Sequence, residues 1–317
     1  ANKRGTEQVI NLVRSFGRDV VHNYMGHVQN NAEEAVRRVI ADLKDGSYSY
    51  AMDCGGVINV TITAHPNDRS ATVDFTGTSS ALDNNFNAPL AVTKAAVLYV
   101  FRVLTGCDIP LNAGCLKPIK LIVPEGCMLN PHYPAAVVAG NVETSQAITN
   151  ALFLATGTLA AAQGTMNNLT FGNDTYQYYE TIAGGTGAGP TFNGTDAIQS
   201  HMTNSRLTDP EVLEWRYPVR LESFGVRNGS GGIGEYNGGC GVTRSIRFLE
   251  PMEAAILSGH RSKGAPGLNG GNAGQPGQTI ITRINGQTET LAAADKSSLN
   301  AGDIITIETP GGGGYGS

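Results

Sequence analysis

Two periodicities divide this chain. From residue 5 to residue 44, apolar residues recur at intervals of three and four positions, which predicts two amphipathic helices or one helix broken near Gly17. After Asp45 and Gly46 the pattern changes to an alternation of period two, which is typical of strands. We therefore expect a helical arm over residues 1–46 and a β-rich body over residues 47–317, with the arm packed on it.

The alternating pattern predicts many short strands. Residues 57–64 and 71–75 pair as a β-hairpin around a turn at 66–69, and residues 119–123 form a short strand between two prolines. The run 135–139 is interpreted as a buried strand. Further strands are expected at 176–182, 218–226, 242–249, 254–259, 278–284, 289–291 and 303–308.

Helical segments are also expected within the body. Residues 89–106 have helical periodicity and end at a glycine, and residues 211–216 form a short helix. A longer helix starts at Asn141 as its N-cap and continues to about Gln163, and its many small residues indicate a buried, central position. The predicted fold class is thus α+β: an N-terminal helical arm and a β-rich body of mixed and antiparallel sheets around a central buried helix.

Composition narrows the possible partners. Charged residues make up 15% of the 317 positions, against about 25% in typical soluble domains, and the 41 glycines indicate many turns. The net charge of −5 argues against nucleic acid, and no stretch is apolar enough for a membrane span. A sparsely charged surface favours burial against partners, and we expect a homo-oligomer.

The cysteines and the first residues bear on location and completeness. The five cysteines are widely spaced without a CxxC pair, which favours reduced thiols in a cytoplasmic protein. No charged segment followed by an apolar run opens the chain, so secretion is not signalled. The chain begins with Ala1, without an initiator methionine, and we expect it to be part of a longer polypeptide.

Polar side chains that suit a binding or catalytic site are concentrated between residues 138 and 206. Glu143 and Glu180 can act as general acid or base if burial raises their pKa values, and His201 is the third catalytic candidate. Asn141 and Glu143 would lie at the positive end of the predicted helix. The candidates for substrate binding are Asn141, Thr144, Asn167, Asn168, Thr203 and Asn204. The alternative is that Asn, Thr and Gly only mark turns here.

Two other patterns are interpreted structurally. His65 and Asp68 have the spacing of a metal pair, but Pro66 and Asn67 between them indicate a turn, so no metal ligands are predicted. Glycine clusters occupy residues 184–189, 229–234 and 311–314. The second matches GxGxxG, but the residues after it cannot open a helix, so we interpret all three as close approaches of the backbone rather than nucleotide loops.

Short motifs along nearly the whole chain match one known family in order. They are VDFTGTS (73–79), NAP (87–89), NPHYPAAVVAGNVETSQ (130–146), AAQGTMNNLTFG (161–172), YYETIAGGTGAG (178–189), HMTNSR (201–206), ExRYPxR (214–220), GGIGEYNGGCGVTR (231–244) and ETPGGGGYG (308–316). In these motifs the chain resembles the hydantoinase B family, which includes the second half of 5-oxoprolinase and the α subunits of acetone and acetophenone carboxylases. The motifs at 166–172 and 178–185 favour 5-oxoprolinase within this family.

The resemblance implies ATP-dependent opening of a cyclic amide, most simply 5-oxoproline to glutamate. It implies that ATP with Mg is bound by a hydantoinase A-like partner domain, and that a divalent metal is bound by the upstream half of the hydantoinase B subunit. This chain matches the C-terminal portion of that subunit and is expected to be inactive alone.

Two alternatives remain open. The same family includes carboxylases, so the chain could belong to the α subunit of an ATP-dependent acetone or acetophenone carboxylase. The other alternative is that the chain is a non-catalytic scaffold portion without a site of its own.

Overall fold

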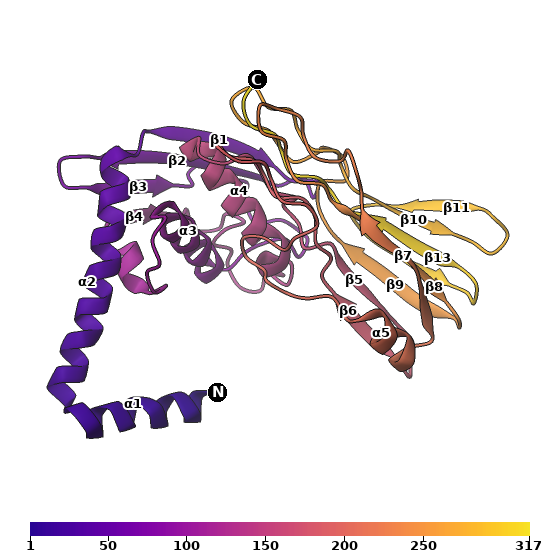
Figure 1. Cartoon of the computed structure of the whole chain (residues 1–317), viewed down its shortest axis with the longest axis horizontal. Coiled ribbons are helices and arrows are strands. Elements are labelled where there is room, and N and C mark those ends of the chain that lie inside the picture. The colour runs from indigo at the N-terminus through magenta and orange to yellow at the C-terminus, as the bar shows by residue number, and fades with distance from the viewer.

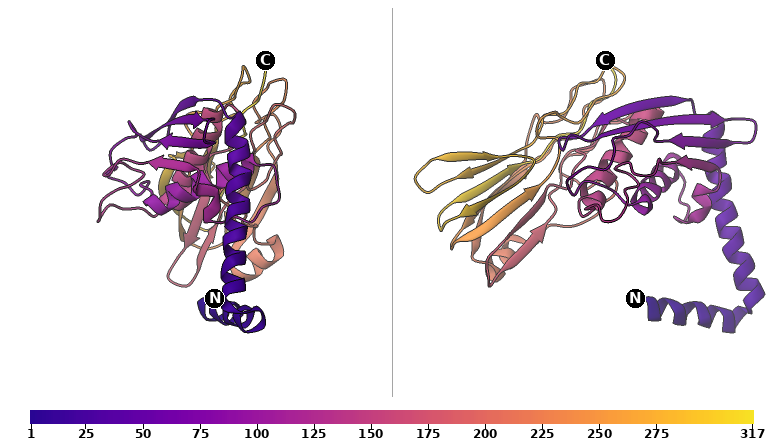
Figure 2. Two further views of the ribbon diagram at one scale, coloured as in Figure 1. Left: turned by 90° about the vertical axis from the view of Figure 1, so that its left-hand side faces the viewer. Right: turned by 180° about the vertical axis from the view of Figure 1, so that it is seen from behind.

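Two helices form an arm that projects from the rest of the molecule (Figure 1). The computed structural model describes residues 1–317 and places α1 at Asn2–Phe16 and α2 at Arg18–Asp42, separated by Gly17 with φ 86°. The prediction of a helical arm broken at Gly17 is confirmed. No residue of α1 is buried, whereas the last part of α2 is anchored in the body (Figure 2). The division of the chain at residue 46 stays a prediction.

The N-terminal half of the body is a four-stranded sheet covered by helices. Its order is β1 (Gly46–Ala51), β2 (Val57–His65), β3 (Ser70–Asp74), β4 (Ile119–Ile122), and only the β3–β4 pair is parallel. The predicted hairpin is confirmed as β2 and β3. β1 was not predicted, although Tyr48 and Tyr50 alternate with serines in its sequence GSYSYA and tyrosine favours strands.

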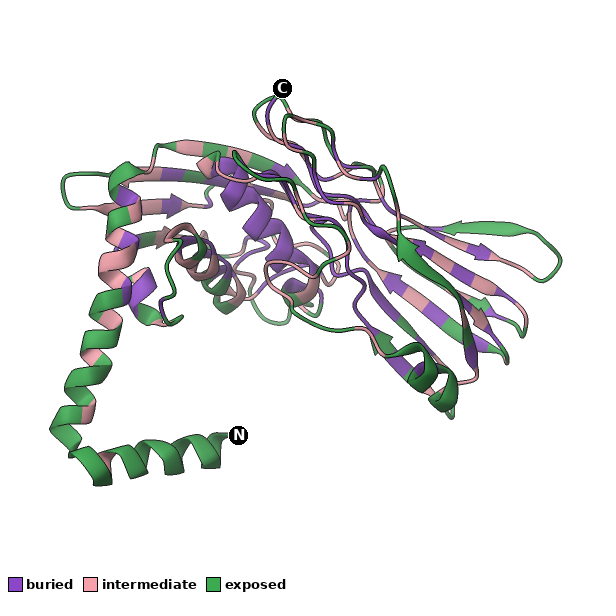
Figure 3. Cartoon of the chain, viewed as in Figure 1, coloured by how far each residue is buried: buried purple, intermediate pink, exposed green.

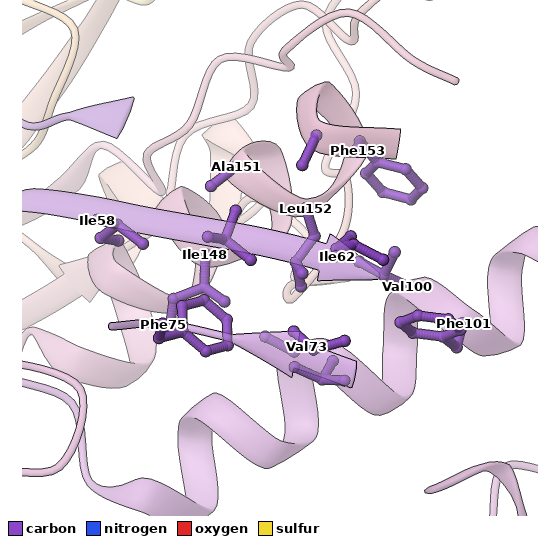
Figure 4. Packing of buried hydrophobic residues seen from close by; sticks show 14 of the residues in the cluster. Ile58, Ile62, Val73, Phe75, Val100, Phe101, Ile148, Ala151, Leu152 and Phe153 are labelled. Atoms are coloured by element: carbon purple, nitrogen blue, oxygen red, sulfur yellow. The ribbon is translucent and has the colours of Figure 1, made fainter. Parts of the chain in front are cut away.

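Helices α3 (Leu90–Leu104) and α4 (Ser145–Thr156) complete the core of this half. Every residue of α4 from Ser145 to Ala155 is buried, so the central buried helix is confirmed (Figure 3). Burying each large apolar side chain stabilises the fold by roughly 1.5–3 kcal/mol. The side chains that strands and helices bring together in Figure 4 include Ile58, Ile62, Val73, Phe75, Val100, Phe101, Ile148 and Leu152.

The C-terminal half contains two antiparallel sheets that share a second core. One has the order β11-β10-β13-β8-β7 and the other β12-β9-β5-β6. The short helix α5 (Pro210–Arg216) begins behind the side-chain cap of Asp209. The strands are β5 (Asn168–Gly172), β6 (Gln177–Glu180), β7 (Val219–Val226), β8 (Val242–Phe248), β9 (Met252–Leu257), β10 (Gln278–Thr282), β11 (Thr288–Leu291), β12 (Ala294–Leu299) and β13 (Ile304–Glu308).

The strand predicted at residues 135–139 is wrong. The segment forms turns and loop, with Val138 71% exposed. A short apolar run does not by itself distinguish a strand from a loop that covers a core.

The helix predicted to reach Gln163 ends at Thr156. Gly157 adopts the left-handed conformation with φ 68°, which stops the helix. Residues 160–163 then run through a buried loop, where the N–H of Ala160 donates to the carbonyl of Ala188. The small residues there serve close packing of loops rather than a helix.

The cap predicted at Asn141 is also wrong. A π-helical turn, η2 (Gly140–Thr144), precedes α4, and its N-cap is Ala139. Asn141 lies inside this turn with its side chain exposed. A second short helix, the 3-10 helix η1 (Ala113–Leu116), precedes β4.

The three glycine clusters pack against one another. A Cβ at Gly311 would lie 1.9 Å from the carbonyl oxygen of Ser230, and one at Gly185 would lie 1.8 Å from that of Gly239. Only glycine permits such approaches. The interpretation as close backbone contacts is confirmed, and the same loops bring the segment after α4 to the sheets of the second half. None of the helices combines the length and apolar character that a bilayer crossing requires.

Candidate functional site

A cavity of about 180 Å³ lies where the end of β1, the start of α4 and the loop after β9 meet. Residues far apart in the chain form its wall, because the sheet of the first half and β9 of the second half converge on the same turn. The side chains in this wall that can do chemistry are Tyr50, Asp53, Cys54, Glu143, His260 and Lys263.

Glu143 is the buried carboxyl group of this cavity and is 1% exposed. It sits in the π-helical turn, a local distortion that often marks functional positions. Its Oε1 accepts three hydrogen bonds, from Thr165 Oγ1 at 2.9 Å, the N–H of Met166 at 3.0 Å and Asn168 Nδ2 at 2.7 Å. Its Oε2 has no protein donor. A carboxyl group held in this way leaves one oxygen free for chemistry.

The protonation of Glu143 follows from these contacts. Desolvation by burial raises its pKa to about 8, against the opposing effects of the hydrogen bonds and the charge of Arg261. The neutral acid therefore predominates at pH 7. Because Oε1 is occupied by three donors, the proton resides on Oε2.

Asn167 and Asn168 directly follow Met166, whose N–H donates to Glu143. Asn168 also donates from Nδ2 to the carbonyl of Leu257 at 2.8 Å and accepts from the hydroxyl of Tyr179 at 2.7 Å. Asn167, in the left-handed region with φ 44°, donates to Gln163 Oε1 at 2.8 Å. Asn168 contacts Glu143 directly and Asn167 does not, and the amides of both residues, which were predicted to bind substrate, are bonded to protein atoms.

Thr144 holds the turn from its other side. It is fully buried, and its hydroxyl donates to the carbonyl of Phe86. Phe86 lines the cavity, so this bond ties the turn of Glu143 to the opposite wall. The role that the structure supports for Thr144 is therefore to position the turn.

Tyr50 and His260 form a fixed pair in the wall that was not predicted. Their Oη and Nε2 atoms are 2.5 Å apart, and His260 Nδ1 lies 2.8 Å from the carbonyl oxygen of Lys263. A carbonyl only accepts, so Nδ1 carries the proton and Nε2 accepts from the tyrosine hydroxyl. Burial raises the pKa of Tyr50 and lowers the pKa of His260, so both are neutral at pH 7.

Asp53 holds the loop after β9, and this contact was also not predicted. Its Oδ2 accepts from the N–H of Arg261 at 2.5 Å and of Ser262 at 3.3 Å. The side chain of Arg261 extends behind the cavity to Asn167 Oδ1 and the carbonyl of Gly259, each at 2.9 Å. Burial lowers its pKa to about 10, so it stays charged at pH 7.

A signal for this loop exists in the sequence. Residues 260–263 read His-Arg-Ser-Lys directly after the predicted strand at 254–259. Consecutive polar residues at the end of a buried strand are a common position for a site. Tyr50 lies in β1 and Asp53 follows it, and neither residue was singled out because this strand was not predicted.

Glu180 lies in the core of the second half, apart from the Glu143 cavity. Its Oε1 is 2.8 Å from Arg244 Nε, its Oε2 is 3.2 Å from Arg244 Nη2, and Tyr178 donates to Oε2 at 2.8 Å. Both carboxylate oxygens are therefore occupied by protein donors. The catalytic role of Glu180 stays a prediction.

His201, Thr203 and Asn204 line a different depression, of about 590 Å³. The ring of His201 lies 5.4 Å from that of Phe153, centroid to centroid, and burial lowers its pKa to about 4. The structure brings these three residues together but does not place them beside Glu143. Asn141 lines neither cavity.

Neither a cluster of metal-ligating side chains nor a glycine-lined phosphate cradle is found in this structure. No group of three or more His, Cys, Asp or Glu side chains is arranged to hold a metal. His65 and Asp68 make turn contacts instead, with Thr72 and Ser70 respectively. The glycine clusters offer no phosphate cradle, because neighbouring backbone fills the space at each close approach.

Two solved structures share this fold. An ATP-dependent caprolactamase from Pseudomonas jessenii superposes with a TM-score of 0.83 over 99% of this chain and 59% of its own, at 21% identity. A nucleotide-free acetone carboxylase superposes with a TM-score of 0.84 over 98% of this chain and 50% of its own, at 16% identity. At these identities the likeness establishes the fold alone.

Sequence comparison identifies the family. The chain is 45% identical to 5-oxoprolinase 1 of Arabidopsis thaliana over 333 aligned positions, covering 100% of this chain and 26% of that protein. It thus spans about a quarter of the length of this relative. The family model described as hydantoinase B/oxoprolinase matches residues 1–317. The chain therefore belongs to the hydantoinase B/oxoprolinase family.

Proposed function

We propose that this chain supplies the ring-opening site of an ATP-dependent cyclic amide hydrolase that converts 5-oxoproline to glutamate. The observation that carries the proposal is Glu143, a buried acid with one oxygen free at a small cavity. The identity to a 5-oxoprolinase along the whole chain supports the substrate, and the fold of a caprolactamase supports the class of reaction.

The chemistry requires a group that both gives and takes a proton. In ring opening, the oxygen of water bonds to the carbonyl carbon, the C–N bond breaks, and the ring nitrogen gains a proton. Glu143 donates the proton on Oε2 to the departing nitrogen and recovers one from the attacking water. A pKa of about 8 suits both transfers near neutral pH.

The surroundings keep Glu143 ready for these transfers. Three donors hold Oε1, so the carboxyl group cannot rotate, and the wall formed by Tyr50 and His260 adds no competing charge. Such preorganisation reduces the reorganisation needed during reaction. Because both transfers use Oε2, one oxygen serves the whole reaction.

ATP and metal belong to other parts of the proposed enzyme. ATP supplies activation of the amide oxygen by phosphoryl transfer, so ring opening by one water would leave an acyl phosphate, from which a second water releases phosphate and the carboxylate of glutamate. ATP with Mg is assigned to a hydantoinase A-like partner domain. A divalent metal is assigned to the upstream half of the hydantoinase B subunit. The complete enzyme is proposed to be a cytoplasmic homo-oligomer in which this chain is inactive by itself.

The test uses the assembled enzyme with its ATP-binding partner. Phosphate release should depend on added 5-oxoproline, with glutamate formed in equal amount. Equal phosphate release with and without the lactam would contradict the proposal.

The fold of acetone carboxylase supports a second candidate function, ketone carboxylation. The same preparation supplied with bicarbonate and acetone tests it directly. Acetoacetate formation without glutamate formation from 5-oxoproline would favour the carboxylase.

A scaffold without a site is distinguished by mutation. Unchanged turnover of Glu143→Gln, in an enzyme that assembles normally, would favour the scaffold over both enzymes.

A further inference from the structure

Lys263 is an unpaired cation at the Glu143 cavity. Lys263 is an exposed residue of the cavity wall, and its ammonium group forms none of the ion pairs or hydrogen bonds in the chain. The other ionised group in the wall, Asp53, is already occupied by donors from Arg261 and Ser262. The free positive charge is therefore available to a molecule that enters the cavity.

The backbone that carries Lys263 is held at several points. Its carbonyl oxygen accepts from His260 Nδ1 at 2.8 Å, and the carbonyl of His260 accepts from the N–H of Gly277 at 2.8 Å. Asp53 accepts hydrogen bonds from the N–H groups of Arg261 and Ser262, the two residues between His260 and Lys263. Because this backbone is already anchored, ligand binding needs to immobilise only the side chain of Lys263, and the loop loses little further conformational entropy.

We propose that Lys263 binds the carboxylate of the substrate and makes the cavity select cyclic amides that bear a carboxylate over neutral lactams. This inference rests on the proposed function and names the specificity-determining residue for it. An ammonium group binds a carboxylate by a charge-assisted hydrogen bond, which is about twice as strong as a neutral one.

The chemistry of the substrate matches the arrangement of the two groups. In 5-oxoproline the carboxylate is attached to the ring carbon next to the nitrogen. A proton donor for the nitrogen and a cation for the carboxylate must therefore belong to the same small cavity, and the wall of this cavity includes both Glu143 and Lys263. At neutral pH the protonated Glu143 does not repel the anion.

The test measures binding of two rings to the assembled enzyme without ATP. The probes are 5-oxoproline and 2-pyrrolidone, which is the same five-membered lactam without the carboxylate. Lys263→Met should weaken 5-oxoproline binding about 10- to 100-fold and leave 2-pyrrolidone binding within about twofold. Lys263→Arg keeps the charge and should stay within about fivefold of the wild type for both rings.

The control is Lys94→Met, which removes an exposed lysine of α3 that lies outside the cavity. It should leave both affinities unchanged, and the unfolding midpoint of each variant verifies folding. Loss of affinity for both rings, or for neither, in Lys263→Met would overturn the inference. ATP-driven glutamate release by the wild type, measured on the same preparation, distinguishes a failure of the proposed function from a failure of the role of Lys263. Its absence contradicts the proposed function, whereas its presence with unchanged binding in Lys263→Met contradicts only the role of the lysine.

Discussion

Two buried glutamates show how differently the halves of this molecule use a carboxyl group. Glu143 in the first half is 1% exposed and Glu180 in the second is 5% exposed. Glu180 is bound by the guanidinium of Arg244 through two contacts, at 2.8 and 3.2 Å. Glu143 receives only uncharged donors, all on one oxygen, and its other oxygen faces a cavity.

The difference lies in the partner, because both groups are almost equally buried. A buried carboxylate that is paired with a guanidinium keeps its charge and contributes to a rigid core. A buried carboxyl group without such a pair keeps its proton to a higher pH, and for Glu143 the pKa rises to about 8. Burial alone therefore does not distinguish the two carboxyl groups; the absence of a direct charged partner makes Glu143 the candidate acid of the proposed function.

The largest effect expected is on activity in Glu143→Gln. The amide keeps the oxygen that accepts from Met166 but cannot exchange a proton, so kcat should fall about 10²- to 10⁴-fold. The measurement is glutamate release from 5-oxoproline by the assembled enzyme, with Glu180→Gln assayed beside it. A greater loss of kcat in folded Glu180→Gln would reverse the comparison.

Removal of Arg244 should have the largest effect on stability. Arg244→Met leaves a buried charge on Glu180 without a partner, which costs about 3–5 kcal/mol of unfolding free energy in denaturant titrations. The matched control is Arg247→Met on the same strand, whose half-exposed pair with Glu222 contributes about 1 kcal/mol or less. Equal effects of the two substitutions would show that the buried pair is not special.

The pH dependence of stability should differ between the wild type and the Glu143→Gln variant. The folded pKa of about 8 lies above the unfolded value near 4.5, so the folded state retains the proton. The stabilisation that the retained proton gives to the folded state is complete below pH 4.5 and is lost as the pH rises to 8. Over this range the free energy of unfolding falls by up to about 1.4 kcal/mol per pH unit.

The window from pH 6.5 to 8 isolates this effect. His201 and His260 have lowered pKa values, so their contribution has the opposite sign and ends near their unfolded value of 6.5. In that window the wild type should lose stability relative to Glu143→Gln. Parallel curves for the two proteins would refute the raised pKa.

The smallest effect is expected at His201. His201→Phe keeps a ring against Phe153 and removes the long contact with Tyr99, at 3.4 Å. Since His201 faces the separate depression, kcat/KM for 5-oxoproline should change by less than about threefold. A loss of a hundredfold or more would bring His201 into the reaction, as the sequence pattern predicted.

Features that depend on neighbouring residues were predictable from the sequence. The break of the arm at Gly17, the β2–β3 hairpin and most strands of the second half follow from periodicity and turn residues. The predicted helix overran its true end, because alanine-rich sequence suits both a helix and a tightly packed loop. Family membership also came from contiguous motifs.

The sequence alone determined the α+β class, the family and Glu143 as one acid among several candidates. Only the tertiary structure decided which polar groups meet, because Tyr50 and His260 contact each other across 210 positions of the chain. It also decided that Arg244 pairs with Glu180, whereas Lys263, which lines the same cavity as Glu143, has no ionic partner. Burial and charge pairing control the pKa and reactivity of a side chain, and both arise from contacts between distant segments, which local patterns do not encode.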